Sequence, residues 1–289
     1  MKKLLFLTLV IVFAFLAVSC NTQNTTNVDD FDFYPLSDGT YAVSGGRTKY
    51  LETIVIPSSY KGKPVTMIAD NAFSEFEMKT VVIPSSVTSI GSSAFRGCRG
   101  LTSIEIPDSV TSIGSDVFYG CSAMKELHIS SVEAWCKVSL YDYTSHPFVS
   151  SRAAERNIYI NGEKITNLVI PDSVTSIGEY AFSGCSGLTS IDIPDSVTSI
   201  GRSAFRGCSG LTSIVIPDSI TSIGNYVFEY CCDFKSVYYY GTARDWSDIT
   251  IGTYNLYLTD ATLYYYSETQ PTTSGNYWHY DENGVPTVW

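Results

Sequence analysis

Apolar residues recur along most of this chain at fixed places in a block that repeats every 23 residues. Residues 188–210 read LTSIDIPDSVTSIGRSAFRGCSG, and residues 211–233 read LTSIVIPDSITSIGNYVFEYCCD. A 27-residue version with the extra run KGKP occupies 51–77. Three further copies lie at 78–100, 101–123 and 165–187. A fixed period of this length indicates a solenoid, in which each repeat packs only on its neighbours.

Within the block that begins at Leu188, the apolar positions predict two short strands and a turn. Leu188–Ile193 ends in alternation of apolar and polar residues, which favours a strand with one buried face. Pro194 ends that strand because proline has no N–H for another ladder bond. Val197–Ile200 is a second extended piece, and Gly201 permits a tight reversal. The short segment 203–208 that follows is expected to be a turn or one helical turn.

The small apolar face of one repeat cannot offset the entropy of ordering it, so we expect stacking to stabilise the whole. The sequence therefore predicts a repeat solenoid of the α/β or mainly β class, with parallel strands and little helix. Equivalent side chains should form inward ladders. The phenylalanine ladders expected are Phe95 with Phe118, and Phe182 with Phe205 and Phe228.

The pattern L-x-x-I-x-I-P-x-S-V-x-x-I-G-x-x-A-F-x-x-C over 51–130 and 165–240 resembles the BspA-like leucine-rich repeat family of bacterial surface proteins. The flanking runs GTYAV at 39–43 and VYYYGTA at 237–243 are similar to the same family. Unlike ordinary leucine-rich repeats, the block has its Cys at its end and no Asn or Cys directly after the strand. The resemblance implies a leucine-rich-repeat-like fold and a role as an adhesin or other surface protein, although a fold alone does not fix a function.

Breaks in the period divide the chain into segments of different kinds. The dipeptide Asn161-Gly162 between apolar residues predicts a hairpin inside one such break. We still expect one continuous domain, since a solenoid grows by adding units. The expected segments are a lipoprotein signal peptide (1–20), a polar tether (21–30), an N-terminal cap (31–50), repeats (51–130), an irregular insert or degenerate repeats (131–164), repeats (165–242) and an aromatic C-terminal cap (243–289).

Residues 1–20 have the composition of an export signal. A charged pair, Lys2-Lys3, precedes the apolar run Leu4–Leu16, which is too short for a comfortable membrane span. The run AVSC at 17–20 resembles a bacterial lipobox, which implies that Cys20 is the mature N-terminus and carries lipid. An ordinary cleaved signal with a spare cysteine is the alternative. We expect a protein of the bacterial cell envelope that is held by lipid, because several acyl chains on one residue anchor firmly where a single chain would not. We also expect it to face outward.

The charge of the chain excludes some partners. The formal net charge is −11, and removal of 1–20, which hold two lysines and no acid, makes it −13. An acidic surface argues against nucleic acid and against electrostatic docking on anionic lipid.

Five cysteines share one position of the repeat: Cys98, Cys121, Cys185, Cys208 and Cys231. Disulfides in an exported protein are one interpretation. Parallel side chains that point into a core do not easily reach disulfide geometry, so the position favours a ladder of buried free thiols. The chain has no C-x-x-C or Cys/His zinc spacing, and we predict no metal site.

Aspartates follow the repeat proline at four places: Asp108, Asp172, Asp195 and Asp218. The last three should lie one above another. We interpret them as solvated turn residues that bond their own backbone. The alternative is a bridging cation such as calcium.

The three histidines, His128, His146 and His279, lie far apart and accompany no catalytic motif, so we predict neither an enzyme nor a cofactor. The outward positions of the first strand in each repeat are the default ligand surface. The candidate binding residues there are Thr53, Thr80, Ser103, Glu105, His128, Asn167, Ser190, Asp192, Ser213 and Tyr238.

Most of these candidates are small and polar, with few of the Trp, Tyr or Arg anchors that dominate tight interfaces. The aromatic residues of 131–164 and of the C-terminus are the stronger candidates for tight binding. We therefore predict a surface-anchored binding or adhesion module for a protein or glycan partner. A structural or envelope-interaction protein without a host ligand is the first alternative, and an enzyme accessory is the second.

Overall fold

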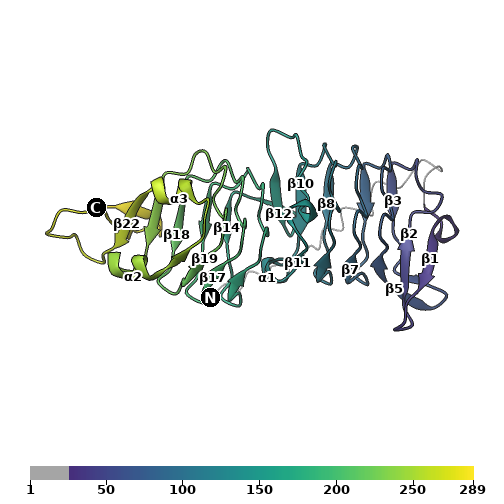
Figure 1. Cartoon of the computed structure of the whole chain (residues 1–289), viewed down its shortest axis with the longest axis horizontal. Helices are drawn as coiled ribbons and strands as arrows, with labels where there is room; N and C mark the ends of the chain where they lie inside the picture. The colour runs from purple at the N-terminus through teal and green to yellow at the C-terminus, as the bar shows by residue number, and fades with distance from the viewer. Residues whose placement is uncertain (1–25) are drawn as a thin grey trace, which may run out of the picture.

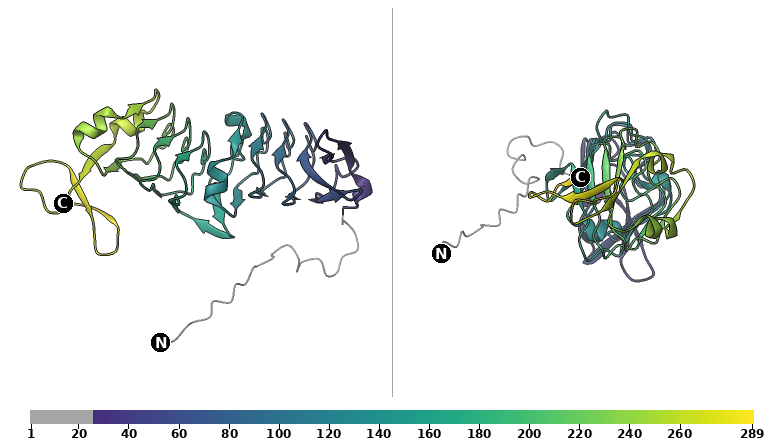
Figure 2. Two further views of the ribbon diagram at one scale, coloured as in Figure 1. Left: turned by 90° about the horizontal axis from the view of Figure 1, so that it is seen from below. Right: turned by 90° about the vertical axis from the view of Figure 1, so that its left-hand side faces the viewer.

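The computed structural model describes residues 26–289, which form an elongated stack of coils running from the N-terminal to the C-terminal end (Figure 1). Seen along its axis, the stack superposes coil on coil (Figure 2). Each regular coil adds one strand to a front sheet and a two-residue strand to a rear sheet. The predicted solenoid of parallel strands with little helix is confirmed.

The front strands that pair with one another do so in parallel, with breaks between β6 and β8 and between β12 and β14. In the first half they are β3 (Thr53–Val55), β6 (Thr80–Val82), β8 (Ser103–Glu105), β10 (Glu126–Ile129) and β12 (Asn157–Ile160), with ladders β3–β6 and β8–β10–β12. In the second half they are β14 (Asn167–Val169), β16 (Ser190–Asp192), β18 (Ser213–Ile216), β20 (Ser236–Tyr239) and β22 (Thr262–Tyr266).

The rear side repeats the same order, with a separate sheet in each half. Its strands are β2 (Tyr41–Ser44), β5 (Lys63–Ile68), β7 (Ser89–Ile90), β9 (Ser112–Ile113) and β11 (Ser139–Leu140), then β15 (Ser176–Ile177), β17 (Ser199–Ile200), β19 (Ser222–Ile223) and β21 (Thr250–Ile251). The remaining elements are β1 (Asp32–Pro35), β4 (Ser59–Tyr60), β13 (Glu163–Ile165), β23 (Tyr277–Tyr280), β24 (Pro286–Val288), α1 (Val132–Cys136), α2 (Ala243–Asp248), α3 (Leu256–Asp260) and 3-10 turns at Val28–Asp30 and Tyr143–Ser145.

Stacked phenylalanines form the centre of the core. Phe182, Phe205 and Phe228 are fully buried, and their ring centroids lie 5.7 and 5.9 Å apart. In the first half, Phe95 lies 5.5 Å from Phe73 and 5.8 Å from Phe118. Both predicted ladders are confirmed, and Phe73 from the 27-residue repeat extends the first.

Gly201 serves the close approach of two coils and not a chain reversal. A Cβ at this position would lie 2.7 Å from the main-chain N of Glu179 in the preceding coil, so only glycine fits. The left-handed backbone conformations fall instead at Ser203 (φ 54°) and Gly207 (φ 72°). The turn over 202–207 is therefore formed by these two residues, and the predicted reversal at Gly201 is wrong.

The segment 131–164 adds one irregular coil and a hairpin. α1 and β11 complete the coil on the rear side, and β12 then joins the front sheet beside β10. β12 and β13 form an antiparallel hairpin with Asn161 and Gly162 in left-handed conformations (φ 52° and 83°), as the Asn-Gly dipeptide predicts. On the other side of the coil, Trp135 Nε1 donates a 2.6 Å hydrogen bond to the carbonyl of Ala181 in the next repeat.

The expected signal peptide, Cys20 and the first half of the tether lie outside the described residues. None of the helices between residues 26 and 289 has the length and apolar character to cross a membrane. At the other end, α2, β21 and α3 complete the last coil, and β23 and β24 extend the front sheet beyond β22.

Replacing Phe205 by Ala should lower the free energy of unfolding by about 3–5 kcal/mol, because it strips ring contacts from two sides of one ladder. The exposed Asp195→Asn is the matched control in the same repeat and should leave the melting temperature nearly unchanged. Thermal melts of both variants test this. A Phe205→Ala protein that melts with the wild type would contradict the assignment of the inward face.

Candidate functional site

The front sheet brings the candidate residues together in two groups. Thr53 lies directly opposite Thr80 in β3 and β6, and Ser103–Glu105 of β8 lies opposite Glu126–His128 of β10. In the second half, Asn167 lies opposite Ser190. All ten candidates are at least partly exposed: Thr53, Thr80, Ser103, Glu105, His128, Asn167, Ser190, Asp192, Ser213 and Tyr238. Their role in binding stays a prediction.

One row of side chains crosses the second half of the front sheet. Register places Asp192, Val215, Tyr238 and Tyr264 next to one another on β16, β18, β20 and β22. Val215 occupies an outward position, yet only 7% of it is exposed. Burial also raises the pKa of the Asp192 carboxyl. Val215 is therefore the most buried member of the row, between the exposed Asp192 and the partly exposed Tyr238 and Tyr264.

An aromatic cluster lies at the C-terminal end of this row. It consists of Tyr238, Tyr240, Tyr264, Tyr266, Trp278 and Tyr280. Trp278 is fully buried, with ring centroids 5.5 Å from Tyr238, 5.1 Å from Tyr240 and 5.2 Å from Tyr266. Its Nε1 donates a 3.0 Å hydrogen bond to the carbonyl of Tyr239. The indole thus fixes the cluster, while the five tyrosines keep part of their surface in water.

Strand alternation explains why the tyrosines gather on one face. In each of the runs Tyr238–Tyr240 and Tyr264–Tyr266, the outer two residues point outward and the middle one points inward. Parallel pairing of β20 with β22 then stacks the outward rings, with centroids 5.5 Å apart for Tyr238 and Tyr264. Sequence reasoning noted the aromatic C-terminus, but the part played by Trp278 depends on how β23 folds back.

A smaller aromatic pair lies in the first half. The His128 ring stacks on Tyr159 of β12 at 4.5 Å between centroids and 10° between planes. His128 Nε2 also lies 3.5 Å from Glu126 Oε2. Tyr159 was not among the predicted site residues, because the irregular spacing before β12 hides its register with β10.

The other two histidines are also held by packing. His146 is buried, and this burial lowers the pKa of its imidazole to about 3, so the ring is neutral at physiological pH. His279 stacks on Trp289 with centroids 3.7 Å apart. The described residues thus place each histidine in a structural contact.

The ladder cysteines are free and buried, as predicted: Cys98, Cys121, Cys185, Cys208 and Cys231. Four of these thiols, those of Cys98, Cys121, Cys208 and Cys231, donate to the main-chain carbonyl of the ladder phenylalanine in the preceding coil. Cys208 Sγ lies 3.1 Å from the oxygen of Phe182, and Cys231 Sγ lies 3.2 Å from that of Phe205. Burial raises the pKa of Cys98, Cys185 and Cys231 to about 12, so none of these thiols is a nucleophile at neutral pH.

The aspartates that follow the repeat proline, Asp108, Asp172, Asp195 and Asp218, are all exposed. Between residues 26 and 289, no group of three or more His, Cys, Asp or Glu side chains has an arrangement that could hold a metal ion.

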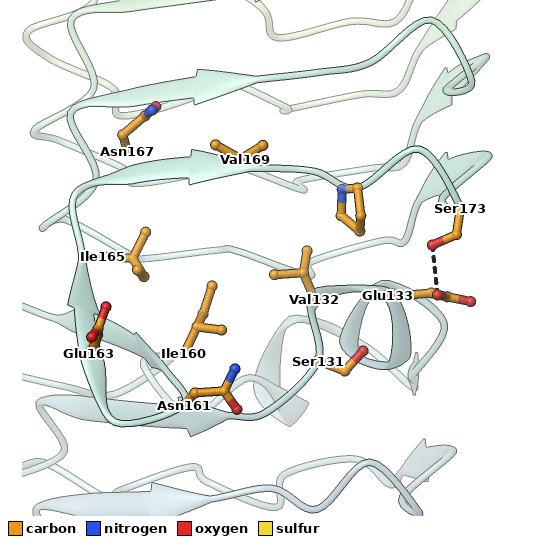
Figure 3. A pocket seen from close by; sticks show the side chains of 11 residues that line it. Ser131, Val132, Glu133, Ile160, Asn161, Glu163, Ile165, Asn167, Val169 and Ser173 are labelled. Atoms are coloured by element: carbon orange, nitrogen blue, oxygen red, sulfur yellow. Dashed lines mark hydrogen bonds between the residues drawn. The ribbon is translucent and has the colours of Figure 1, made fainter. Parts of the chain in front are cut away.

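A cleft of about 680 Å³ opens between the two halves, where the β12–β13 hairpin meets β14 (Figure 3). The side chains of Val132, Ile160 and Ile165 point into it. At one end, Ser173 Oγ donates a 2.6 Å hydrogen bond to Glu133 Oε2. The only sequence signal for this cleft is the break in the period between Ile129 and Ile165.

The comparisons with known proteins agree on the repeat. The family model of the BspA type leucine-rich repeat region matches residues 46–146 and 153–263, in six copies. No curated protein matches the chain.

Several solved bacterial structures are similar to the chain. A leucine-rich repeat protein of T. pallidum is 24% identical, over 79% of this chain and 86% of that one, with a TM-score of 0.45. A leucine-rich repeat protein from Bacteroides ovatus is 24% identical, over 84% and 71%, with a TM-score of 0.44. A leucine rich cell surface protein from Faecalibacterium prausnitzii is 19% identical, over 80% and 98%, with a TM-score of 0.31.

The burial of the thiols predicts their reactivity. In the native chain from residue 21 onward, a thiol reagent should modify the exposed Cys232 quickly and the six buried cysteines only after unfolding. Cys232→Ser should remove the fast class alone. Disulfide-linked peptides that join Cys185 to Cys208 in a mass spectrum would contradict the free-thiol ladder.

Proposed function

Because this chain belongs to the BspA-type leucine-rich repeat family, we propose that its solenoid is a binding and adhesion module displayed on the bacterial cell envelope for a protein or glycan partner. Membership in a leucine-rich repeat family favours an interaction module over an enzyme. We place the proposed binding site at the aromatic cluster at the C-terminal end of the front sheet.

The aromatic cluster has the features of a binding anchor. Tyrosines supply large contact area at low entropic cost, and their hydroxyl groups can hydrogen-bond to a peptide or a sugar. Tyr238, Tyr240, Tyr264, Tyr266 and Tyr280 are partly exposed around a buried Trp278, which holds them in place before a partner arrives. Preorganisation of this kind lowers the cost of binding.

The rest of the front sheet suits the rim of such an interface. Its serine and threonine side chains, such as Thr53, Thr80 and Ser213, are small and hydrogen-bonding. Such side chains improve the fit to a partner surface but contribute little to the free energy of binding. The net charge of −13 without residues 1–20 favours a neutral or basic partner.

The double variant Tyr238→Ala with Tyr264→Ala should weaken binding to the partner by roughly 30-fold, the effect of losing about 2 kcal/mol at a hot spot. Arrays of glycans and of extracellular matrix proteins, probed with the chain from residue 21 onward, identify the partner for this measurement. Thr53→Ala with Thr80→Ala is the control on the same face of the first half. Equal affinity of the aromatic variant and the wild type would move the binding site away from the aromatic cluster.

The same proposal places a lipid anchor on Cys20, on the basis of the apolar run Leu4–Leu16 and the lipobox-like AVSC at 17–20. Metabolic labelling with a radioactive fatty acid should mark the wild-type protein and not Cys20→Ala. Cys232→Ala is the matched control and should be labelled normally. Equal labelling of wild type and Cys20→Ala would remove the anchor from the proposal.

Exposure separates this function from the alternative of an envelope protein without a host ligand. Brief protease treatment of intact cells should release the solenoid if it faces outward. Complete protection on intact cells, with digestion after lysis, would favour the structural alternative.

A further inference from the structure

β14 has one edge that faces the cleft and not another strand. Among the described residues, β14 pairs only with β16. The oxygen of Thr166 accepts a 2.7 Å hydrogen bond from the N–H of Thr189, and the N–H of Ile170 donates a 3.0 Å bond to Asp192. Thr166 and Ile170 therefore direct their main-chain groups toward β16.

Successive residues of a strand direct these groups to opposite edges. The N–H and C=O of Asn167 and Val169 consequently point away from β16. Both residues line the cleft. An edge of this kind is a template for another strand.

The floor of the cleft is apolar. Val132 comes from the start of α1, Ile160 from the end of β12 and Ile165 from the end of β13, and Figure 3 shows all three directed into the gap below Val169. The volume of about 680 Å³ lies within the range of ordinary ligand pockets. A strand added to β14 would place alternate side chains on this floor.

The charge of the cleft selects among peptides. Two acids, Glu133 and Glu163, line it, and no basic residue does. Glu133 forms a 2.5 Å ion pair with Lys137, and hydrogen bonds from Lys137 and Ser173 lower the pKa of its carboxyl. Glu163 lies exposed at the start of β13. A peptide whose charge complements the cleft would therefore place a positively charged side chain beside Glu163.

We propose that this cleft binds an extended peptide segment of a partner protein, which adds to β14 as a strand, buries alternate apolar side chains against Ile160 and Ile165, and places a Lys or Arg beside Glu163. This mode of recognition takes affinity from main-chain hydrogen bonds and specificity from side-chain pockets. The proposal rests on the proposed function in supposing a protein partner, but it uses a site separate from the aromatic cluster.

A fluorescein-labelled peptide, Lys-Thr-Val-Thr-Val-Thr-Val-Lys, tests the site by fluorescence anisotropy with the chain from residue 21 onward. We expect saturable binding. A peptide N-methylated at alternate amides should bind about 10- to 30-fold more weakly, because it loses hydrogen bonds to Asn167 and Val169. Val169→Pro should have a similar effect, since it removes an N–H that points into the cleft.

Charge reversal provides the matched comparison. Glu163→Lys should weaken binding of the Lys-ended peptide several-fold. It should strengthen binding of the same peptide with Glu in place of the terminal lysines. Glu268→Lys makes the same change of charge in the exposed loop after β22 and should alter neither affinity. Equal binding of the N-methylated peptide, no response to Glu163→Lys or no binding at millimolar concentration would each overturn the proposal.

Two further outcomes distinguish this site from the front face. If the Tyr238→Ala, Tyr264→Ala double variant loses the peptide, the aromatic cluster is its site, and the cleft proposal fails while the proposed function stands. If the array partner binds and the peptide does not, only the cleft proposal fails. Dimerisation of the free chain that Glu163→Lys abolishes would make a second copy the occupant and would overturn the assignment to a partner protein.

Discussion

Hydrogen bonding between the main chains of successive coils is the constraint on which the rest of this molecule depends. Parallel strands lie about 4.8 Å apart, so every coil must repeat the path of its neighbour at that spacing. Nothing larger than glycine fits at Gly201, where a Cβ would lie 2.7 Å from the main chain of the preceding coil. The same spacing brings equivalent phenyl rings into contact, as in the 5.7 Å separation of Phe182 and Phe205.

The features that could be predicted from the sequence are those that recur with the period. The strand around Ile191, the Phe182–Phe205–Phe228 ladder and the buried free thiols each follow from the rule that position n of one coil lies over position n of the next. The role of Gly201 was misread because tight reversal and close approach both select glycine. Only the structure distinguishes them, since the left-handed residues are Ser203 and Gly207.

The features that could not be predicted all depend on the breaks in that period. Tyr159 reaches His128 only because β12 takes the place beside β10 after an irregular stretch. The insert also affects the two sides of the solenoid unequally. Strand pairing breaks on both sides, between β11 and β15 and between β12 and β14, but on the rear side the Trp135 side chain still bonds to the next repeat at Ala181. A cleft that arises from this inequality has no local signature in the residues that line it.

The thiol ladder has a consequence for how the protein is made. Cys208 and Cys231 each donate to a carbonyl of the adjacent coil, and every cysteine between residues 26 and 289 is free, so this part of the native chain contains no cross-link that an oxidant must form. Folding of residues 26–289 then depends on neither a disulfide catalyst nor the correction of wrong pairings, a step that slows the folding of many exported proteins. The chain can reach the same final structure under reducing or oxidising conditions, and recombinant production in a reducing cytosol should yield native material.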